Sequence, residues 1–248
     1  MPFLPLHDNA PRVLITHAWV TWGLIAACVL VYFLGQDSGP EGQRLAYGLG
    51  VIPATLTGEA ELTTEFYLVP APATLVTSLF LHGGFMHLLG NMLYLWVFGD
   101  NVEDCMGHAR FVAFYLLCGI LAALTQVAAD PGSVTPTIGA SGAISGVLGA
   151  YLVLHPRAKV LVPIVIIPLY LPAFVLLLIW IGFQFLQAWS SGAAGGGVAW
   201  WAHIGGFLVG AILVVPFRYR AIPLFGAADP PGGLRIAPGF RRPRRPGD

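Results

Sequence analysis

Charged residues are scarce in this sequence of 248 residues: Asp, Glu, Lys and Arg together make up 10% of it, whereas an ordinary soluble domain carries roughly a quarter. Hydrophobic residues make up 56%, and the mean hydropathy is +0.76. This composition argues against a soluble globular fold and indicates that the lipid bilayer is the protein's solvent. The basic and acidic residues cancel to a net charge of zero, so no positive surface argues for a nucleic-acid partner.

Other familiar signals are also missing from the sequence. The three cysteines, Cys28, Cys105 and Cys118, lie far apart in no metal or redox spacing, and an odd count does not make a disulfide framework. The N-terminal region has no short apolar core that ends in a small-residue cleavage site, so the first apolar run is expected to remain as a helix. No internal repeat of the helical pattern is visible, which weighs against the inverted-repeat transporters.

Long apolar runs are what the sequence does contain. A run of about 20 apolar residues can cross the hydrocarbon layer as a helix. Six such runs lie at about residues 19–34, 77–98, 111–129, 140–154, 171–189 and 198–217. Pro163, Pro168 and Pro172 interrupt the apolar stretch before the fifth run, so that stretch is expected to be an interfacial segment. The sequence therefore predicts an all-α membrane protein built as a six-helix transmembrane bundle.

The basic residues predict the orientation of this bundle. With six spans and the N-terminus inside, Arg44 is the one Lys or Arg that falls on the outer side. We therefore expect both termini in the cytoplasm. The chain divides into a cytoplasmic segment 1–18, a membrane domain 19–217 and a basic cytoplasmic tail 218–248. The tail from Gly226 onward is rich in Pro, Gly and Arg, a composition that cannot bury a core and is expected to be disordered.

Polar side chains inside the apolar runs are the first functional signal, because ionisable groups there are costly in free energy. His82, His87 and Asn91 stand out in the second predicted helix, and His87 and Asn91 share a helix face because they are four residues apart. As isolated residues, they would more often serve as hydrogen-bonding contacts between helices. Metal binding is disfavoured, since no carboxylate or thiol lies at ligand spacing in the same layer, and no cofactor is expected.

A serine and a histidine stand near the starts of the fourth and sixth predicted helices. Ser141 lies in the first helical turn, where free backbone N–H groups can face a developing oxyanion. His203 is followed by Gly206 and Gly210, a pattern that allows close approach of another helix. A serine hydroxyl needs such a base to become a nucleophile near neutral pH. Taken singly, Ser141 is a small-residue packing contact and His203 a buried core histidine.

The predicted topology brings these polar residues to one depth. With the N-terminus inside, the second, fourth and sixth helices all start at the outer face of the membrane. The five polar residues of these helices all fall in their outer halves: His82, His87, Asn91, Ser141 and His203. Unrelated core residues would agree in depth and side only by coincidence, so a joint site is favoured over separate packing roles.

Four segments together resemble a known family. They are His82 with His87 and Asn91, then the segment 99–107, which looks like a Gly-x-x-x-Glu-x-x-x-Gly turn after the second helix, then Gly139-Ala140-Ser141-Gly142, and finally Ala202-His203-Ile204-Gly205-Gly206. In order, spacing and membrane side they resemble the rhomboid family of intramembrane serine proteases, over about residues 15–217. There are two departures: the first outer loop lacks the family's Trp-Arg pair, and Ser145 stands where some members carry an aromatic residue under the histidine.

The resemblance implies a six-helix rhomboid-like fold and a set of roles. Ser141 would be the nucleophile and His203 the general base and acid, with no third acidic member. His87 and Asn91 would join the Ser141 backbone N–H as an oxyanion site, and His82 would hydrogen-bond near it and help hold its water. The fifth helix and the outer loop before the sixth would form a lateral gate.

The function implied is that of an intramembrane serine endopeptidase that cleaves single-span transmembrane proteins in the bilayer. Its expected location is the bacterial plasma (inner) membrane, with the active site toward the outer face. A protease-dead relative that binds membrane clients is the alternative, although such relatives usually lack the serine or the histidine. A transporter or proton channel is less favoured, because it would need polar residues through the inner helix halves, which are mainly Leu, Val and Ala.

The predicted orientation can be measured by cysteine-accessibility labelling. We expect positions around Gly39 to be labelled from the outer side and positions around Arg241 from the cytoplasmic side, because nearly all basic residues fall inside. The opposite pattern would move the candidate dyad to the cytoplasmic side of the membrane.

Overall fold

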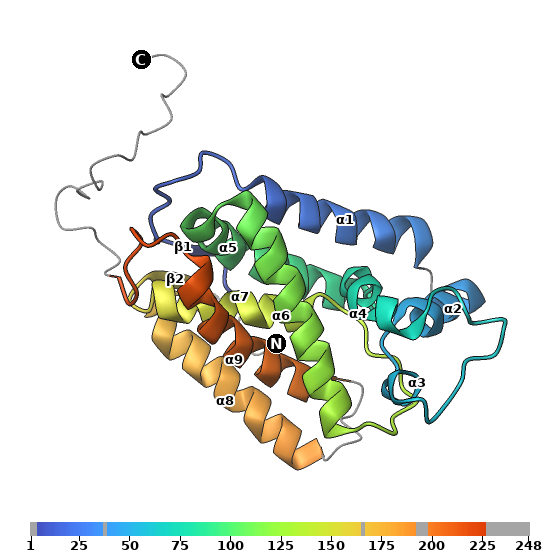
Figure 1. Cartoon of the computed structure of the whole chain (residues 1–248). Coiled ribbons are helices and arrows are strands. Elements are labelled where there is room, and N and C mark those ends of the chain that lie inside the picture. Colours follow the sequence, from blue (N-terminus) through green and yellow to red (C-terminus); the bar gives the residue numbers. More distant parts are fainter. Residues whose placement is uncertain (1–3, 37–38, 165–166, 192–197, 227–248) are drawn as a thin grey trace.

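The computed structural model describes residues 4–36, 39–164, 167–191 and 198–226 as a bundle of apolar helices (Figure 1). In chain order the elements are β1 (His7–Asp8), α1 (Trp19–Gly35), α2 (Pro40–Leu49), α3 (Pro53–Thr57), η1 (Ala71–Ala73), α4 (Thr74–Thr77), η2 (Ser78–Phe80), α5 (Phe85–Met106), α6 (His108–Ala129), α7 (Ser141–Leu154), β2 (Lys159–Ile164), β3 (Ile167–Pro172), α8 (Ala173–Ser191) and α9 (Trp200–Phe217). Strands β1 and β2 lie at one end of the bundle, and α2 and α3 lie at the other (Figure 1).

The helices match the apolar runs because a backbone in lipid must satisfy its hydrogen bonds internally. Helices α6, α8 and α9 are long and apolar enough to cross a membrane, and α5 joins them if it and the short helices before it form one bent span. Helices α1 and α7 are shorter apolar helices. The predicted helical membrane bundle is confirmed, and the crossing of the bilayer by all six helices stays a prediction.

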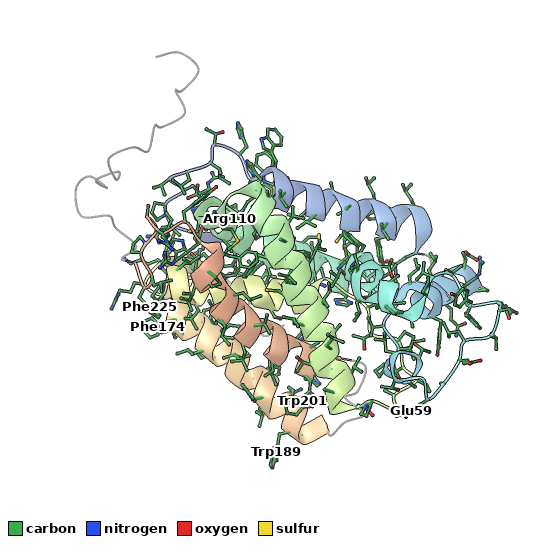
Figure 2. All side chains as sticks on the ribbon, in the orientation of Figure 1. Glu59, Arg110, Phe174, Trp189, Trp201 and Phe225 are labelled. Carbon is green, nitrogen blue, oxygen red and sulfur yellow. The ribbon has the colours of Figure 1, made fainter. Side chains whose placement is uncertain are left out.

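The outer surface of the bundle carries large apolar side chains. Leu34 is 82% exposed, Ile212 69% and Trp189 90%. Figure 2 shows Phe174 and Trp189 at opposite ends of α8, both directed away from the bundle. A soluble protein rarely exposes such extensive apolar surface, whereas in a bilayer it faces acyl chains. The protein is therefore an integral membrane protein.

Helix α7 runs through the centre of the bundle and touches α9 backbone to backbone. Nearly all of its residues are buried, and it packs against α5, α6 and α9. A Cβ atom added to Gly206 would overlap the carbonyl group of Gly142, and one added to Gly210 would overlap that of Gly146. Because glycine has no Cβ, the two helix backbones can approach to contact.

The second predicted helix, residues 77–98, is not one straight helix. The chain bends by 81° between the short helices that end at Phe80 and α5, which begins at Phe85. Gly83 and Gly84 lie in the break, and glycine is among the poorest helix formers. The prediction that His82 lies on the same helix as His87 and Asn91 is therefore wrong: His82 lies in the bend before α5.

The segment 99–107, expected as a turn after the second helix, is the last part of α5 instead. Helix α5 continues to Met106, and the chain reverses at Gly107, which has a φ of +78°. A Cβ at Gly107 would lie 2.6 Å from the hydroxyl of Tyr219. Both the positive φ and this close approach require glycine, so only the final glycine of the pattern makes the turn.

Two carboxylates at this end of α5 anchor the start of the chain. Glu103 is fully buried and accepts hydrogen bonds from the Thr21 N–H at 2.8 Å and the Thr21 hydroxyl at 2.7 Å. Asp104 accepts three hydrogen bonds from successive N–H groups of residues 13–15, at 2.7 to 2.8 Å. A charged carboxylate accepts stronger hydrogen bonds than a neutral oxygen does. These contacts therefore fix α1 against α5.

The stretch before the fifth helix, expected as an interfacial segment, forms a β-hairpin. Strands β2 and β3 pair antiparallel, with Val162 opposite Leu169, and β1 adds His7 opposite Leu161. Val162 is buried while Tyr170 is 61% exposed. The prolines prevent a helix, and the β-branched residues between them favour a strand. Helix α8 consequently begins at Ala173, two residues after the predicted start.

Beyond α9 the described chain folds back onto the bundle. The N–H of Tyr219 donates to the Cys105 carbonyl at 2.9 Å, and that of Phe225 donates to the Val153 carbonyl at 2.7 Å. The rest of the predicted disordered tail, 227–248, lies outside the described residues, as does the predicted gate loop at 192–197.

Substituting Gly210→Ala should destabilise the bundle, because the new methyl group overlaps the Gly146 carbonyl and pushes α7 and α9 apart. We expect a loss of about 3 kcal/mol in the free energy of unfolding, the upper part of the range for overpacking. Thermal unfolding of the detergent-solubilised protein measures this. The matched control is Gly182→Ala on the exposed side of α8, where a Cβ meets nothing within 4 Å. Equal unfolding midpoints for the two variants would contradict the close helix contact.

Candidate active site

A cavity of about 520 Å³ opens where α5, α7 and α9 begin, and α8 forms part of its wall. Of the residues singled out by the sequence, Ser141, His203 and His87 line this cavity, whereas His82 and Asn91 do not. The structure thus brings three of the five predicted residues to one cavity surface.

Ser141 and His203 make the central contact of the cavity. Ser141 is the first residue of α7, and His203 lies in the first turn of α9, 62 positions later in the chain. The Ser141 Oγ and the His203 Nε2 are 2.9 Å apart, a hydrogen-bonding distance. The glycine contact between α7 and α9 makes this approach possible, because bulkier residues would separate the helix starts.

The His203 ring is held by three residues that sequence analysis did not single out. The ring centroids of Trp180 and Trp200 lie 6.1 and 6.0 Å from it, and the Gln184 Oε1 lies 2.8 Å from its Nδ1. His203 itself is 7% exposed. The available signal for Gln184 was an amide, one of two with Gln187, in an otherwise apolar part of a helix. The two tryptophans resemble ordinary membrane aromatics.

Ser145, at the position where some members of the family that the chain resembles carry an aromatic residue, bonds back to its own helix. Its hydroxyl donates to the Ser141 carbonyl at 2.6 Å, a bond back to the preceding helical turn. Support for the His203 ring comes instead from Trp180 on α8 and Trp200 on α9.

His87 presents a hydrogen-bond donor to the cavity. The Gly83 N–H donates to the His87 Nδ1 at 3.3 Å, so in the neutral ring the proton is on Nε2. A Cβ at Gly139 would lie 2.9 Å from that Nε2, and the Gly139 φ is +127°. Only glycine tolerates both conditions, so the glycine two positions before Ser141 lets His87 approach the serine.

His82 and Asn91 are buried close to this site. His82 is 2% exposed, and its ring centroid lies 5.2 Å from that of His87. Asn91 follows His87 by one helical turn and is fully buried. The side-chain N and O atoms of both residues have no hydrogen-bond partner within the part of the chain that the structure describes. A buried polar group without a hydrogen-bond partner is costly in free energy, so these two side chains stand out among the residues near the cavity.

A serine hydroxyl against an imidazole, with a second imidazole N–H nearby, is suited to nucleophilic attack on a carbonyl carbon. No group of three or more His, Cys, Asp or Glu side chains that could hold a metal ion occurs among the described residues. The contact between the Ser141 hydroxyl and the His203 ring can support acyl transfer through the serine oxygen.

Comparisons of the sequence with known proteins point to one family. A family model described as the rhomboid domain matches residues 71–220. The chain is 35% identical to the rhomboid protease GluP of Bacillus subtilis (strain 168) over 201 residues, which are 79% of this chain and 35% of that protein. It is 33% identical to the mitochondrial rhomboid protein 1 of Saccharomyces cerevisiae over 153 residues, 58% of this chain and 41% of the relative. The chain thus spans well under half the length of these relatives.

A serine-directed phosphonate should label Ser141, and labelling should require His203, because the hydroxyl has negligible nucleophilicity near neutral pH without a base. Mass-spectrometric mapping of the adduct measures this. We expect Ser141→Ala and His203→Ala each to abolish labelling. Ser145→Ala is the matched control one turn along α7 and should keep it, since its hydroxyl is bonded to a backbone carbonyl. Full labelling of a folded His203→Ala variant would disprove the pairing.

Proposed function

Because the chain belongs to the rhomboid family, we propose that it is an intramembrane serine endopeptidase that cleaves transmembrane segments of other membrane proteins. The observation that carries the proposal is the 2.9 Å contact between the Ser141 hydroxyl and the His203 ring inside a cavity of a membrane bundle. A core histidine or a packing serine would need neither the cavity nor this contact.

The reaction begins with His203 as the general base. Its Nε2 takes the hydroxyl proton while the Ser141 Oγ bonds to the carbonyl carbon of the scissile peptide. The imidazolium then gives this proton to the leaving nitrogen as the C–N bond breaks, which leaves an acyl ester on Ser141. A water molecule, deprotonated by His203, hydrolyses the ester and restores the enzyme.

The negative charge that develops on the carbonyl oxygen needs donors. The His87 Nε2–H and the Ser141 backbone N–H in the first turn of α7 fill this role. Asn91, one turn after His87 on the same helix, is the further amide donor that the family resemblance implies, although it lies outside the cavity lining. His82 lies against His87 and helps to hold it and the water of the site.

The substrates that suit this site are single-span membrane proteins. The cavity wall contains apolar residues such as Met86, Phe183 and Val198, so an apolar segment can enter from the bilayer. A spanning helix already pairs its own backbone amides, so it must unwind before a peptide carbonyl reaches Ser141. Segments with glycine or proline near the cleavage position unwind at lower cost and are the preferred substrates.

The location that fits is the bacterial plasma membrane, with both termini in the cytoplasm. Arg218 follows the C-terminal end of α9, and Arg110 donates to the Phe217 carbonyl at that same end. Arg12 pairs with Asp100, whose neighbour Asn101 donates to Asp8 of β1, so these arginines lie far from the starts of α7 and α9. Under the positive-inside rule, the sheet end is cytoplasmic and the dyad is nearer the outer face.

The proposal is tested with purified protein in liposomes and a panel of single-span substrates. We expect cleavage by the wild type and a loss of at least about a thousandfold in Ser141→Ala, because removal of one member of a catalytic unit disables the whole. Replacing glycine and proline in the substrate by leucine should slow cleavage. If a folded wild type binds these proteins without cutting any, the chain is a client-binding relative rather than a protease.

A further inference from the structure

Gln184 is a buried amide on the inward face of α8, where the other buried residues, such as Leu177 and Ile181, are apolar. Its neighbours Phe185 and Leu186 are 47% and 61% exposed, whereas Gln184 is 3% exposed. A polar side chain in a spanning helix is costly unless it has partners, and it is a functional candidate for that reason. The partners of Gln184 are His203 and the backbone carbonyl of Trp180.

These two partners decide which way the amide faces. The Gln184 Nε2 lies 3.3 Å from the Trp180 carbonyl oxygen, and the Gln184 Oε1 lies 2.8 Å from the His203 Nδ1. A carbonyl oxygen can only accept a hydrogen bond, so the atom next to it must be the NH₂ group. The opposite orientation would set two oxygens against each other in a buried place. The amide oxygen therefore faces His203.

The orientation of the amide selects the tautomer of His203. An amide oxygen accepts, so the His203 Nδ1 carries the proton and donates it. The Nε2 of the neutral ring is then unprotonated and accepts from the Ser141 hydroxyl at 2.9 Å. Hydrogen bonds thus run in one direction, from Ser141 through His203 and Gln184 to the Trp180 carbonyl. A ring protonated at Nε2 could not remove the serine proton.

We propose that Gln184 is a positioning residue that holds His203 in the tautomer and ring orientation required of a general base. The inference rests on the proposed endopeptidase function and extends it to a third helix. In a serine triad a buried carboxylate orients the histidine. A neutral amide supplies the same acceptor without the cost of burying a charge in the membrane. Because Gln184 lies on α8, the activity of the dyad depends on how α8 packs against the bundle.

The variant Gln184→Met removes the amide and keeps a side chain of similar length and volume. We expect kcat to fall about ten- to hundredfold, part of what general-base catalysis contributes, with KM changed less than about twofold. The matched control is Gln187→Met, one turn along α8 at a half-buried position. Thermal unfolding of each variant in detergent corrects the rates for the folded fraction.

The variant Gln184→Glu distinguishes positioning from packing. A carboxylate restores the acceptor and also stabilises the imidazolium, so the acidic limb of the kcat/KM profile should shift to higher pH. It should also recover part of the activity that methionine removes. Nitrogen NMR of histidine-labelled protein, assigned with His203→Ala, should show the Nδ1–H tautomer in the wild type and its depletion in Gln184→Met.

The failure of this inference and that of the proposed function give different results. If wild type cleaves, Ser141→Ala does not, and a folded Gln184→Met has wild-type kcat and tautomer population, the role of Gln184 is overturned while the protease remains. If Ser141→Ala cleaves as well as the wild type, the endopeptidase assignment itself fails. Should Gln184→Met not fold, an unshifted pH profile of Gln184→Glu overturns the role instead.

Discussion

The backbone contact between α7 and α9 is the constraint on which the rest of the structure depends. Gly149 on α7 and Gly206 and Gly210 on α9 lack the Cβ atoms that would overlap the backbone of the facing helix. In a bilayer the hydrophobic effect does not drive helices together, so close backbone packing supplies much of the free energy of helix association. The same contact sets the starts of both helices side by side, and the Ser141 to His203 distance of 2.9 Å follows from it.

The two ends of the bundle use different polar chemistry. At the sheet end, Glu103 and Asp104 are carboxylates that accept several backbone or hydroxyl hydrogen bonds each and tie the start of the chain to α5. The described polar side chains that line the cavity are hydroxyls, an amide and imidazole rings, with no Asp, Glu, Lys or Arg among them. Uncharged groups can be buried near lipid at lower cost, and a hydroxyl, an amide and a neutral imidazole can each both donate and accept, which suits proton transfer along a hydrogen-bonded chain.

Helix positions were predictable from hydropathy, because every run that must bury its backbone in lipid has to be a helix. Hydropathy averages do not register a bend, however, so the 81° break at Gly83 and Gly84 was read as part of one helix. Hydropathy averages also leave open the secondary structure of the apolar residues before α8. A short apolar run is compatible with a strand or a helix, and the pairing of residues 159–164 with 167–172 decided for a hairpin.

For the site, the sequence by itself determined that the solvent is lipid and that Ser141 and His203 are a candidate pair. Both conclusions come from local signals, which are polar residues within apolar runs and the motifs of the family. Only the tertiary structure decided that Gln184 on α8 meets the far side of the His203 ring. It also decided that His82 and Asn91 stay out of the cavity lining. Contacts between helices depend on the rotation and tilt of each one about its own axis. Those angles cannot be read from a helix that is apolar on nearly every face.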